Sequence, residues 1–346
     1  CPRETHALAT PRTNNPMGEF ELIRRHFQRA GQVARPGVTL GIGDDCALLQ
    51  PHAGFQLAVS TDMLVEGRHF FADVDPEALG HKALAVNLSD LAAMGARPLG
   101  FTLALALPQA DEAWLAAFAR GLFALADAHA CPLVGGDTTR GPLNICITVM
   151  GEVRPGLAMQ RSQAQVGDDL YLTGRTGEAR LALELMRGTA WALLACGPHV
   201  LEEHAELRAR LERPTPRVEL GSLLAVLGHA VHAAIDVSDG LAGDLGHILA
   251  ASGVGAELAL AALPVAPALQ LLPMTERMDC LLNGGDDYEL LFTAAPIARA
   301  AVEAAALASH TPVQRIGRIS AAPGLRVLDA SGHPLAVSAR GFDHFA

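Results

Sequence analysis

Hydrophobic and polar positions repeat with two different periods along the chain, which predicts a mixture of strands and helices. Short apolar runs typical of strands occur at residues 38–43, 55–65, 101–107, 131–137 and 144–153. Helical spacing of apolar residues is found from about Glu19 to Ala30, after Pro76, and from about Asp111 to His129. The order β-β-α-β-α-β-β indicates a mixed α/β plan rather than a strict βαβ repeat.

The helix after Pro76 has the clearest local signals. Asp75 is a candidate N-cap, Pro76 falls in the first turn, and Gly95 comes just after the last periodic residue. Proline at the start and glycine past the end are the expected boundary residues of a helix. We therefore expect one long helix between these signals.

A polar, turn-rich stretch around residues 154–165 interrupts this pattern, and a new strand begins at Asp169. The second half shows further runs, strand-like at 232–237, 288–294 and 313–319, and helical at 178–187, at 217–227 and after Ser238. We predict a boundary near residues 152–160 and two domains, 17–153 and 154–346. Residues 1–16 lack hydrophobic periodicity and are interpreted as a disordered leader.

The composition is that of a compact globular protein. Of the 346 residues, 50% are hydrophobic and 18% are charged, which excludes a disordered or collagen-like chain. No apolar run approaches the ~18 residues that a membrane span requires. The six cysteines are scattered, without a CxxC pair or a secretory signal, and this favours a reducing cytoplasm.

The charge balance limits the ligands. The chain has 26 Lys and Arg against 37 Asp and Glu, a formal net charge of −11, and no basic run. Because nucleic-acid affinity depends on Lys and Arg, this balance argues against a nucleic-acid partner. A polyanionic ligand would then need metal ions as intermediaries.

Aspartate recurs in small, glycine-rich turns at the ends of apolar strands, in GIGDDCALL, VSTDMLVEG, LVGGDTTRG, AIDVSDG and NGGDDYEL. Strand ends of this kind can bring their carboxylates to a common edge. Several carboxylates, with few His and no paired Cys, suit Mg²⁺ better than Zn²⁺ or copper. Asp and Gly are also ordinary turn residues, so one motif decides nothing, but five together favour a metal site.

Asp90 gives the strongest argument from a single residue. It lies near the C-terminal end of the helix after Pro76, where the helix dipole disfavours a carboxylate. Asn87 precedes it by three residues and therefore shares its face of an otherwise apolar helix. A bound cation would compensate both costs, whereas a solvated or Arg-paired Asp90 is the alternative.

Common nucleotide-binding and hydrolase signatures are absent. The sequence has no G-x-x-x-x-G-K-[ST] loop, no G-x-G-x-x-G opening a helix, no protein-kinase set and no G-x-S-x-G elbow. Phosphates would thus be held through metals and backbone amides. Arg161 is a candidate for phosphate oxygens, although a surface role is equally compatible with the sequence, and His69 could contact an anionic substrate.

With these motifs in order, the chain resembles the thiamine-monophosphate kinases, a family of the aminoimidazole ribonucleotide synthetase-like ATP-binding superfamily. The resemblance extends from GEFELI at Gly18 to GFDHF at Phe345. Its motifs are GIGDDCALL, STDMLVEGRHF, HKALAVNLSDLAAMGARP, GGDTTRG, DVSDGL, GGDDYEL and GFDHF.

The resemblance implies an N-terminal α/β domain that dimerises through its sheet, a C-terminal α+β domain, and ATP in a cleft roofed by the N-terminal sheet. It implies transfer of the ATP γ-phosphoryl group to thiamine monophosphate. Matching positions imply Mg²⁺ ligands at Asp45, Ser60, Thr61, Asp62, Asp90, Asp137, Asp236 and Asp239. They imply ATP contacts at Gly136, Asp137, Arg161 and Ser238, and thiamine-side contacts at His69, Asp286 and Phe342. Asp45, Asp62, Asp90 and Asp236 are the implied catalytic set.

Two positions depart from the usual pattern of the family. Asp286 stands where the family often has Glu, and Phe342 stands where it more usually has Tyr or Trp. The shorter Asp would reach a substrate amine less directly, and Phe342 keeps a stacking face without a polar tip.

The implied chemistry is direct in-line phosphoryl transfer assisted by several Mg²⁺ ions. A substrate phosphate with a pKa near ~6 is already largely dianionic at neutral pH, so no general base is needed. One alternative is a related ATP-dependent enzyme with another acceptor, as in selenophosphate synthesis, hydrogenase maturation or purine cyclisation. The other is a nucleotide-binding regulator without catalysis.

Overall fold

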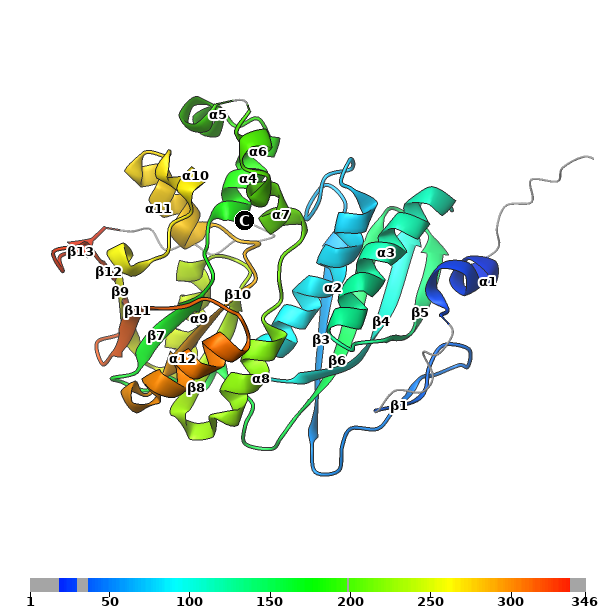
Figure 1. Ribbon diagram of the computed structural model, residues 1–346, viewed down its shortest axis with the longest axis horizontal. Coiled ribbons are helices and arrows are strands. Elements are labelled where there is room, and N and C mark those ends of the chain that lie inside the picture. Colours follow the sequence, from blue (N-terminus) through cyan, green and yellow to red (C-terminus); the bar gives the residue numbers. More distant parts are fainter. Residues whose placement is uncertain (1–18, 30–36, 198, 337–346) are drawn as a thin grey trace, which may run out of the picture.

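The computed structural model describes residues 19–29, 37–197 and 199–336, in which two large β-sheets are flanked by helices (Figure 1). The first half of the chain forms a four-stranded sheet and the second half a seven-stranded sheet. The mixed α/β class predicted from the sequence is therefore confirmed. The predicted leader, residues 1–16, and Phe342 lie outside the described residues. No helix within the described ranges is long and apolar enough to span a membrane.

The four-stranded sheet has the order β3-β6-β4-β5, with β6 antiparallel to both neighbours and β4 parallel to β5. Its strands are β3 (Gln56–Val65), β6 (Asn144–Val153), β4 (Arg97–Leu107) and β5 (Leu133–Arg140). Burial alternates along β6, where Ile145, Ile147 and Val149 face the helices. On β3 the opposite face is exposed, so only one side of this sheet is fully covered by the chain's own helices.

Two helices cover the inner face of this sheet, α2 (Pro76–Ala93) and α3 (Glu112–Ala128). Asp75 accepts a hydrogen bond from the backbone N–H of Glu77 at 3.1 Å, as an N-cap does. Asp111 caps α3 in the same way. Both helices begin where their cap residues predict, and α2 ends just before Gly95 as expected.

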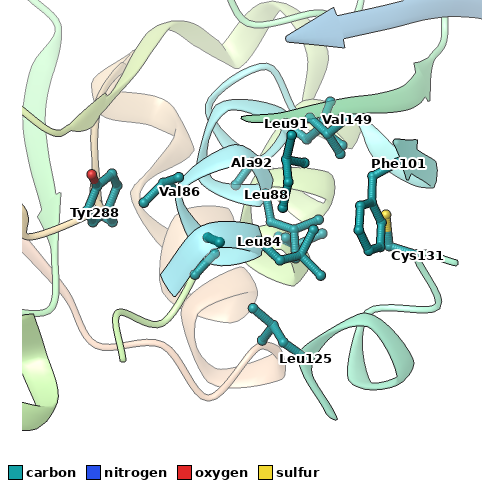
Figure 2. Close-up of a cluster of buried hydrophobic side chains, with 14 of the residues drawn as sticks. Leu84, Val86, Leu88, Leu91, Ala92, Phe101, Leu125, Cys131, Val149 and Tyr288 are labelled. Carbon is teal, nitrogen blue, oxygen red and sulfur yellow. The ribbon is translucent and has the colours of Figure 1, made fainter. Parts of the chain in front are cut away.

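Glycines allow α2 and α3 to touch backbone to backbone. A Cβ atom on Gly80 would lie 2.0 Å from the carbonyl oxygen of Phe118, and one on Gly121 would lie 1.8 Å from that of Glu77. No side chain larger than hydrogen fits at either position. After Gly80 along α2, the side chains of Leu84, Leu88 and Leu91 pack on the sheet; Figure 2 shows them beside Phe101 and Val149.

The seven-stranded sheet has the order β13-β12-β9-β11-β7-β10-β8 and is mostly antiparallel. Its strands are β7 (Asp169–Thr173), β8 (Val231–Val237), β9 (Gly255–Ala259), β10 (Glu289–Ala294), β11 (Val313–Ser320), β12 (Gly324–Leu328) and β13 (Pro334–Leu335). The larger helices of this half are α4 (Glu178–Met186), α7 (Ala205–Glu212), α8 (Val218–Val226), α9 (Leu241–Ser252), α11 (Met274–Asn283) and α12 (Arg299–Ala308). Short helices α5 (Ala190–Cys196), α6 (Val200–Glu203) and α10 (Pro267–Gln270) complete it.

The sheet of the second half is covered on both faces. Leu291 belongs to a core with α4, α9 and α11, whereas its neighbours Leu290 and Phe292 belong to a core that also contains α2, α8 and α12 residues. The second of these cores is continuous with the interior of the first half. Helix α2 thus lies between α3 and the second half of the chain (Figure 1).

Helix α8 holds α2 from the side of the second half. A Cβ atom on Gly221 would lie 2.1 Å from the carbonyl oxygen of Ala92, and one on Gly95 would lie 2.4 Å from the Cβ of Ala225. Helix α2 is therefore packed closely on two sides, and its polar residues have fixed positions.

Candidate functional site

Three carboxylates from β3, α2 and β8 lie near enough to influence one another's ionisation, and we call Asp62, Asp90 and Asp236 the acidic cluster. The hydroxyl of Ser60 donates a short hydrogen bond to Oδ2 of Asp90. The backbone N–H of Asp62 donates to Oδ1 of Asn87 at 3.1 Å. The helix face that the sequence pattern assigned to Asn87 and Asp90 is thus the face that binds β3.

Asp236 reaches the cluster from the seven-stranded sheet. Its residue is only 5% exposed, and its Oδ2 accepts a hydrogen bond from the hydroxyl of Ser89 at 2.8 Å. Burial and then the nearby charge of Asp90 together raise the pKa of Asp236 to about 8. This carboxyl group is costly to ionise while no cation is beside it.

The other two members show the same electrostatic effect. Burial and then the charges of Asp90 and Asp239 raise the pKa of Asp62 to about 6. Burial raises the pKa of Asp90 as well, opposed by the Ser60 hydrogen bond and by the charge of Arg161. Carboxylates that repel one another in a buried position fit a hard divalent cation, which would compensate their charge.

The loop after β8 has a fixed shape because Asp244 binds it from within α9. Oδ2 of Asp244 accepts hydrogen bonds from the backbone N–H groups of Ser238, Asp239 and Gly240, each at 3.1 Å. Burial raises the pKa of Asp244 to about 7 in spite of these hydrogen bonds. The loop holds Asp239 close enough to Asp62 to influence its ionisation.

A pocket lies beside the N-terminal part of α2, whereas Asp90 of the acidic cluster lies near the C-terminal end of this helix; we call it the acceptor pocket. Both halves of the chain contribute to it, with His69 and Lys82 from the first half and Asp286 from the second. Apolar side chains complete its wall, among them Phe70, Phe71, Val74, Leu183, Met186 and Leu211. The structure therefore brings together His69 and Asp286, two of the residues expected to contact one substrate.

Asp286 has an unusual backbone conformation. Its φ angle is 67°, in the left-handed region, and its N–H donates to the carbonyl oxygen of Ser238 at 2.9 Å. Its Oδ1 forms an ion pair with Nζ of Lys82 at 3.0 Å and accepts a hydrogen bond from the hydroxyl of Tyr288 at 3.2 Å. The loop before β10 thus presents this carboxylate to the pocket in one orientation.

The remaining expected residues do not join the acidic cluster within one chain. Asp45, Gly136 and Asp137 line a different pocket, together with Phe27 and Thr102. Across the sheet, Asp62 lies opposite Ile147, then Leu103, then Gly136, which is three strand spacings or about 14 Å.

The side chains of Asp137 and Thr61 lie on the opposite face of the sheet from that of Asp62. Asp137 pairs in register with the exposed Ala104, whereas Asp62 pairs with the buried Ile147. The hydroxyl of Thr61 lies 2.8 Å from that of Thr148, on the exposed side. Among the described residues, no three His, Cys, Asp or Glu side chains are placed so that they alone could hold a metal ion.

Sequence reasoning did not single out Lys82, Tyr288 or Ser89. A signal for Lys82 existed, because it precedes Asp90 by eight residues and lies on the same side of an apolar helix. Tyr288 and Ser89 had none, since their partners Asp286 and Asp236 are identified only by the folded structure.

Comparisons with known proteins identify the family to which the chain is similar. Two family models match, "AIR synthase related protein, N-terminal domain" over residues 43–153 and "AIR synthase related protein, C-terminal domain" over residues 165–330. The thiamine-monophosphate kinase of Salmonella typhimurium is 44% identical over 331 residues, which cover 95% of this chain and 98% of that protein.

Two solved structures are similar over most of the chain. The crystal structure of thiamine-monophosphate kinase from Stenotrophomonas maltophilia K279a has a TM-score of 0.77 at 49% identity, covering 88% of this chain and 94% of that one. The structure of AaThiL complexed with AMPPCP and TMP has a TM-score of 0.70 at 28% identity, covering 86% and 89%.

Proposed function

The chain belongs to the thiamine-monophosphate kinase family, within the AIR synthase related proteins, and is therefore a kinase; we propose that it transfers the γ-phosphoryl group of ATP to thiamine monophosphate, giving thiamine diphosphate. The observation that carries the proposal is the 44% identity to a kinase of that name over 95% of the chain. The AMPPCP and TMP bound to the similar AaThiL structure support ATP and thiamine monophosphate as the two ligands.

In this proposal the two ligands meet along α2. The phosphates of ATP approach the acidic cluster, where Arg161 supplies positive charge near Asp90 and Ser238 lies on the loop fixed by Asp244. Thiamine monophosphate occupies the acceptor pocket beside His69 and Asp286. Its phosphate oxygen then attacks the γ-phosphorus in line with the leaving group.

The chain's own residues contribute position and electrostatics rather than a proton acceptor. A substrate phosphate with a second pKa near ~6 is largely dianionic at neutral pH, so it attacks without a general base. The rigid placement of α2 and of the loop after β8 holds both substrates in a reactive geometry. No covalent intermediate with the enzyme is part of this mechanism.

We include magnesium in the proposal because the acidic cluster fits it. Asp236 is buried, Asp62 and Asp90 are half-buried, and the pKa values of all three are raised; their oxygens are the ligands that Mg²⁺ prefers. Ser60 and Asp239 adjoin them and would complete the set. When bound, several Mg²⁺ ions would neutralise the phosphate charge that a chain with a net charge of −11 cannot offset.

The proposal also includes a homodimer formed through the open face of the four-stranded sheet. Leu57, Val59 and Met63 on β3 are 50%, 58% and 52% exposed, and they form an apolar stripe that no helix covers among the described residues. Asp137 and Thr61 lie on the same face. A second copy bound to this face would bring four expected ligand-binding residues to the interface of two chains, namely Asp45, Thr61, Gly136 and Asp137.

The decisive experiment is incubation of the purified protein with Mg-ATP and thiamine monophosphate, with thiamine diphosphate measured by chromatography. Product that depends on enzyme, ATP and Mg²⁺ is the expected result. Turnover of free thiamine or selenide instead, with no thiamine diphosphate formed, would favour another enzyme of the superfamily. Nucleotide binding without turnover of any acceptor would favour a regulator.

We also place the protein in the cytoplasm. Its described cysteines, Cys46, Cys131, Cys146, Cys196 and Cys280, carry free thiols, which supports a reducing compartment. Neither a nucleic acid nor a membrane is a partner in this proposal, in keeping with the acidic charge balance.

A further inference from the structure

A buried lysine lies between the two halves of the site. Lys82 is 3% exposed on a helix whose surrounding residues are almost all apolar. Lysine is rarely buried to this extent unless its charge is paired. Its partner is Asp286, whose Oδ1 lies 3.0 Å from Nζ, and no other ion pair of Lys82 occurs among the described residues.

Both donors that reach Asp286 bind the same oxygen. The hydroxyl of Tyr288 donates to Oδ1, and Nζ of Lys82 makes its closest approach to the same oxygen, whereas within the described part of the chain no hydrogen bond reaches Oδ2. The backbone of Asp286 is fixed as well, by its left-handed φ angle and its hydrogen bond to Ser238. One oxygen is therefore occupied by the protein, while the other is available as an acceptor in the pocket that Asp286 lines.

We propose that Lys82 is a positioning residue that binds Oδ1 of Asp286 and thereby leaves Oδ2 to accept a hydrogen bond from an amine of the phosphoryl acceptor. This role rests on the proposed function, since it assumes that the acceptor substrate occupies the acceptor pocket. Lys82 does not serve the phosphates of ATP, because it precedes Asp90 by two helical turns, about 12 Å along α2.

Tyr288 assists in the same arrangement. Tyr288 is 9% exposed, and its ring packs in the core on the Val86 side of α2, as Figure 2 shows. Burial raises the pKa of this phenol well above its usual value, so it stays a hydrogen-bond donor to Oδ1. The two donors together fix the rotation of the Asp286 carboxylate.

The test is steady-state kinetics of Lys82→Met, which removes the charge and keeps the apolar stem. We expect the KM for thiamine monophosphate to rise at least tenfold, while the KM for ATP changes less than twofold. Tyr288→Phe, which removes only the second donor, is expected to raise the same KM by a smaller factor. Arg299→Met, which breaks an ion pair with Asp169 away from the site, is the control and leaves both KM values unchanged.

A double-mutant cycle with Asp286→Asn tests whether Lys82 acts through Asp286. In the Asp286→Asn background, Lys82→Met is expected to change the KM for thiamine monophosphate less than twofold further. Independent effects that multiply would instead show that Lys82 contacts the substrate itself and would overturn the positioning role.

The outcomes also separate this role from the proposed function. The positioning role alone is overturned if the wild-type enzyme phosphorylates thiamine monophosphate and both Lys82→Met and Tyr288→Phe keep the wild-type KM for that substrate. Absence of thiamine diphosphate with the wild-type enzyme overturns the proposed function and this role with it. If Lys82→Met does not fold, the KM of Tyr288→Phe decides.

Discussion

The ionisation of Asp236 couples the chemistry of the site to the stability of the fold. Its pKa is about 8 in the folded protein against a usual value of 3.8. Between these values the folded state binds the proton more tightly than the unfolded chain does. The contribution of Asp236 to the free energy of unfolding is therefore fully present below about pH 4 and is lost as the pH rises to about 8.

Replacement of this carboxyl by an amide is expected to stabilise the metal-free protein. Asp236→Asn should raise Tm at pH 8 by about 2–4 °C for each 1 kcal/mol relieved, and the difference from wild type should shrink towards pH 4. Thermal unfolding in a chelating buffer at several pH values between 4 and 8 measures it. The same variant should lose activity, because it removes one of the proposed cation ligands.

Asp169→Asn is the matched control, for which the expected change in Tm at pH 8 has the opposite sign. Arg299 and Arg315 bind the carboxylate of Asp169, and these partners hold its pKa below the usual value even though burial opposes them. Its stabilising contribution is present above its unfolded pKa and is lost as the pH falls through the lower folded value. Asp169→Asn should therefore lower Tm at pH 8. A shift of both variants in one direction would contradict the electrostatic assignment.

Asp90 is the residue whose loss should affect turnover most selectively. Asp90→Asn keeps the shape of the side chain and an acceptor for the Ser60 hydroxyl, so the fold should be retained. We expect kcat to fall by about 100-fold or more, a loss typical for removal of a group that balances transition-state charge. Thiamine diphosphate formation and the circular dichroism spectrum measure the two properties. Near-normal turnover would rule out the acidic cluster as the cation site.

At the scale of elements, the contact between α2 and α3 makes glycine necessary. Gly121→Ala would place a Cβ atom 1.8 Å from a carbonyl oxygen and force the helices apart, which should lower the free energy of unfolding by about 1–3 kcal/mol. Gly246→Ala in α9 is the control, since nothing lies within 4 Å of its Cβ position. That substitution should stabilise the protein by up to ~1 kcal/mol through helix propensity. Urea denaturation compares the two, and equal effects would contradict the close crossing.

Elements with strong local signals were predictable from the sequence. Helix α2 begins at Pro76 and α3 just after Asp111 because cap residues and proline act within a single turn. Helices α5 and α7 were not predicted, and neither has a hydrogen bond from a capping side chain. They are stabilised by packing of residues such as Leu207 in the core that also contains Leu291, and a local sequence pattern does not reveal such packing.

The same limit applied to the site. Asp90 and Asn87 were identifiable because they lie one turn apart on one helix. The separation of Asp62 from Asp137 was not identifiable from the sequence, because it depends on the strand order β3-β6-β4-β5 and on the face of the sheet that each side chain occupies. The pairing of Lys82 with Asp286 joins residues from opposite halves of the chain, so only the folded structure identifies it.

At the scale of the molecule, the open sheet face gives a test of assembly. Val59→Asp places a charge in the centre of the proposed interface and should convert a dimer into a monomer. Ile297→Asp is the control, because Ile297 is 93% exposed and lies in the second half of the chain. Light scattering coupled to size exclusion measures both masses. A wild-type monomer, or a dimer that persists in Val59→Asp, would contradict this interface.

The close packing of α2 against α8 has a consequence for motion. A hinge between the halves would have to pull Gly221 away from the Ala92 carbonyl and separate the pairs Ser89–Asp236 and Lys82–Asp286. Such an opening would expose a continuous core, so we expect the two halves to move as one body and the substrates to enter a pocket that is already formed. Small-angle X-ray scattering should therefore give the same radius of gyration with and without Mg-AMPPCP and thiamine monophosphate. A compaction on ligand binding would show that the enzyme works by domain closure instead.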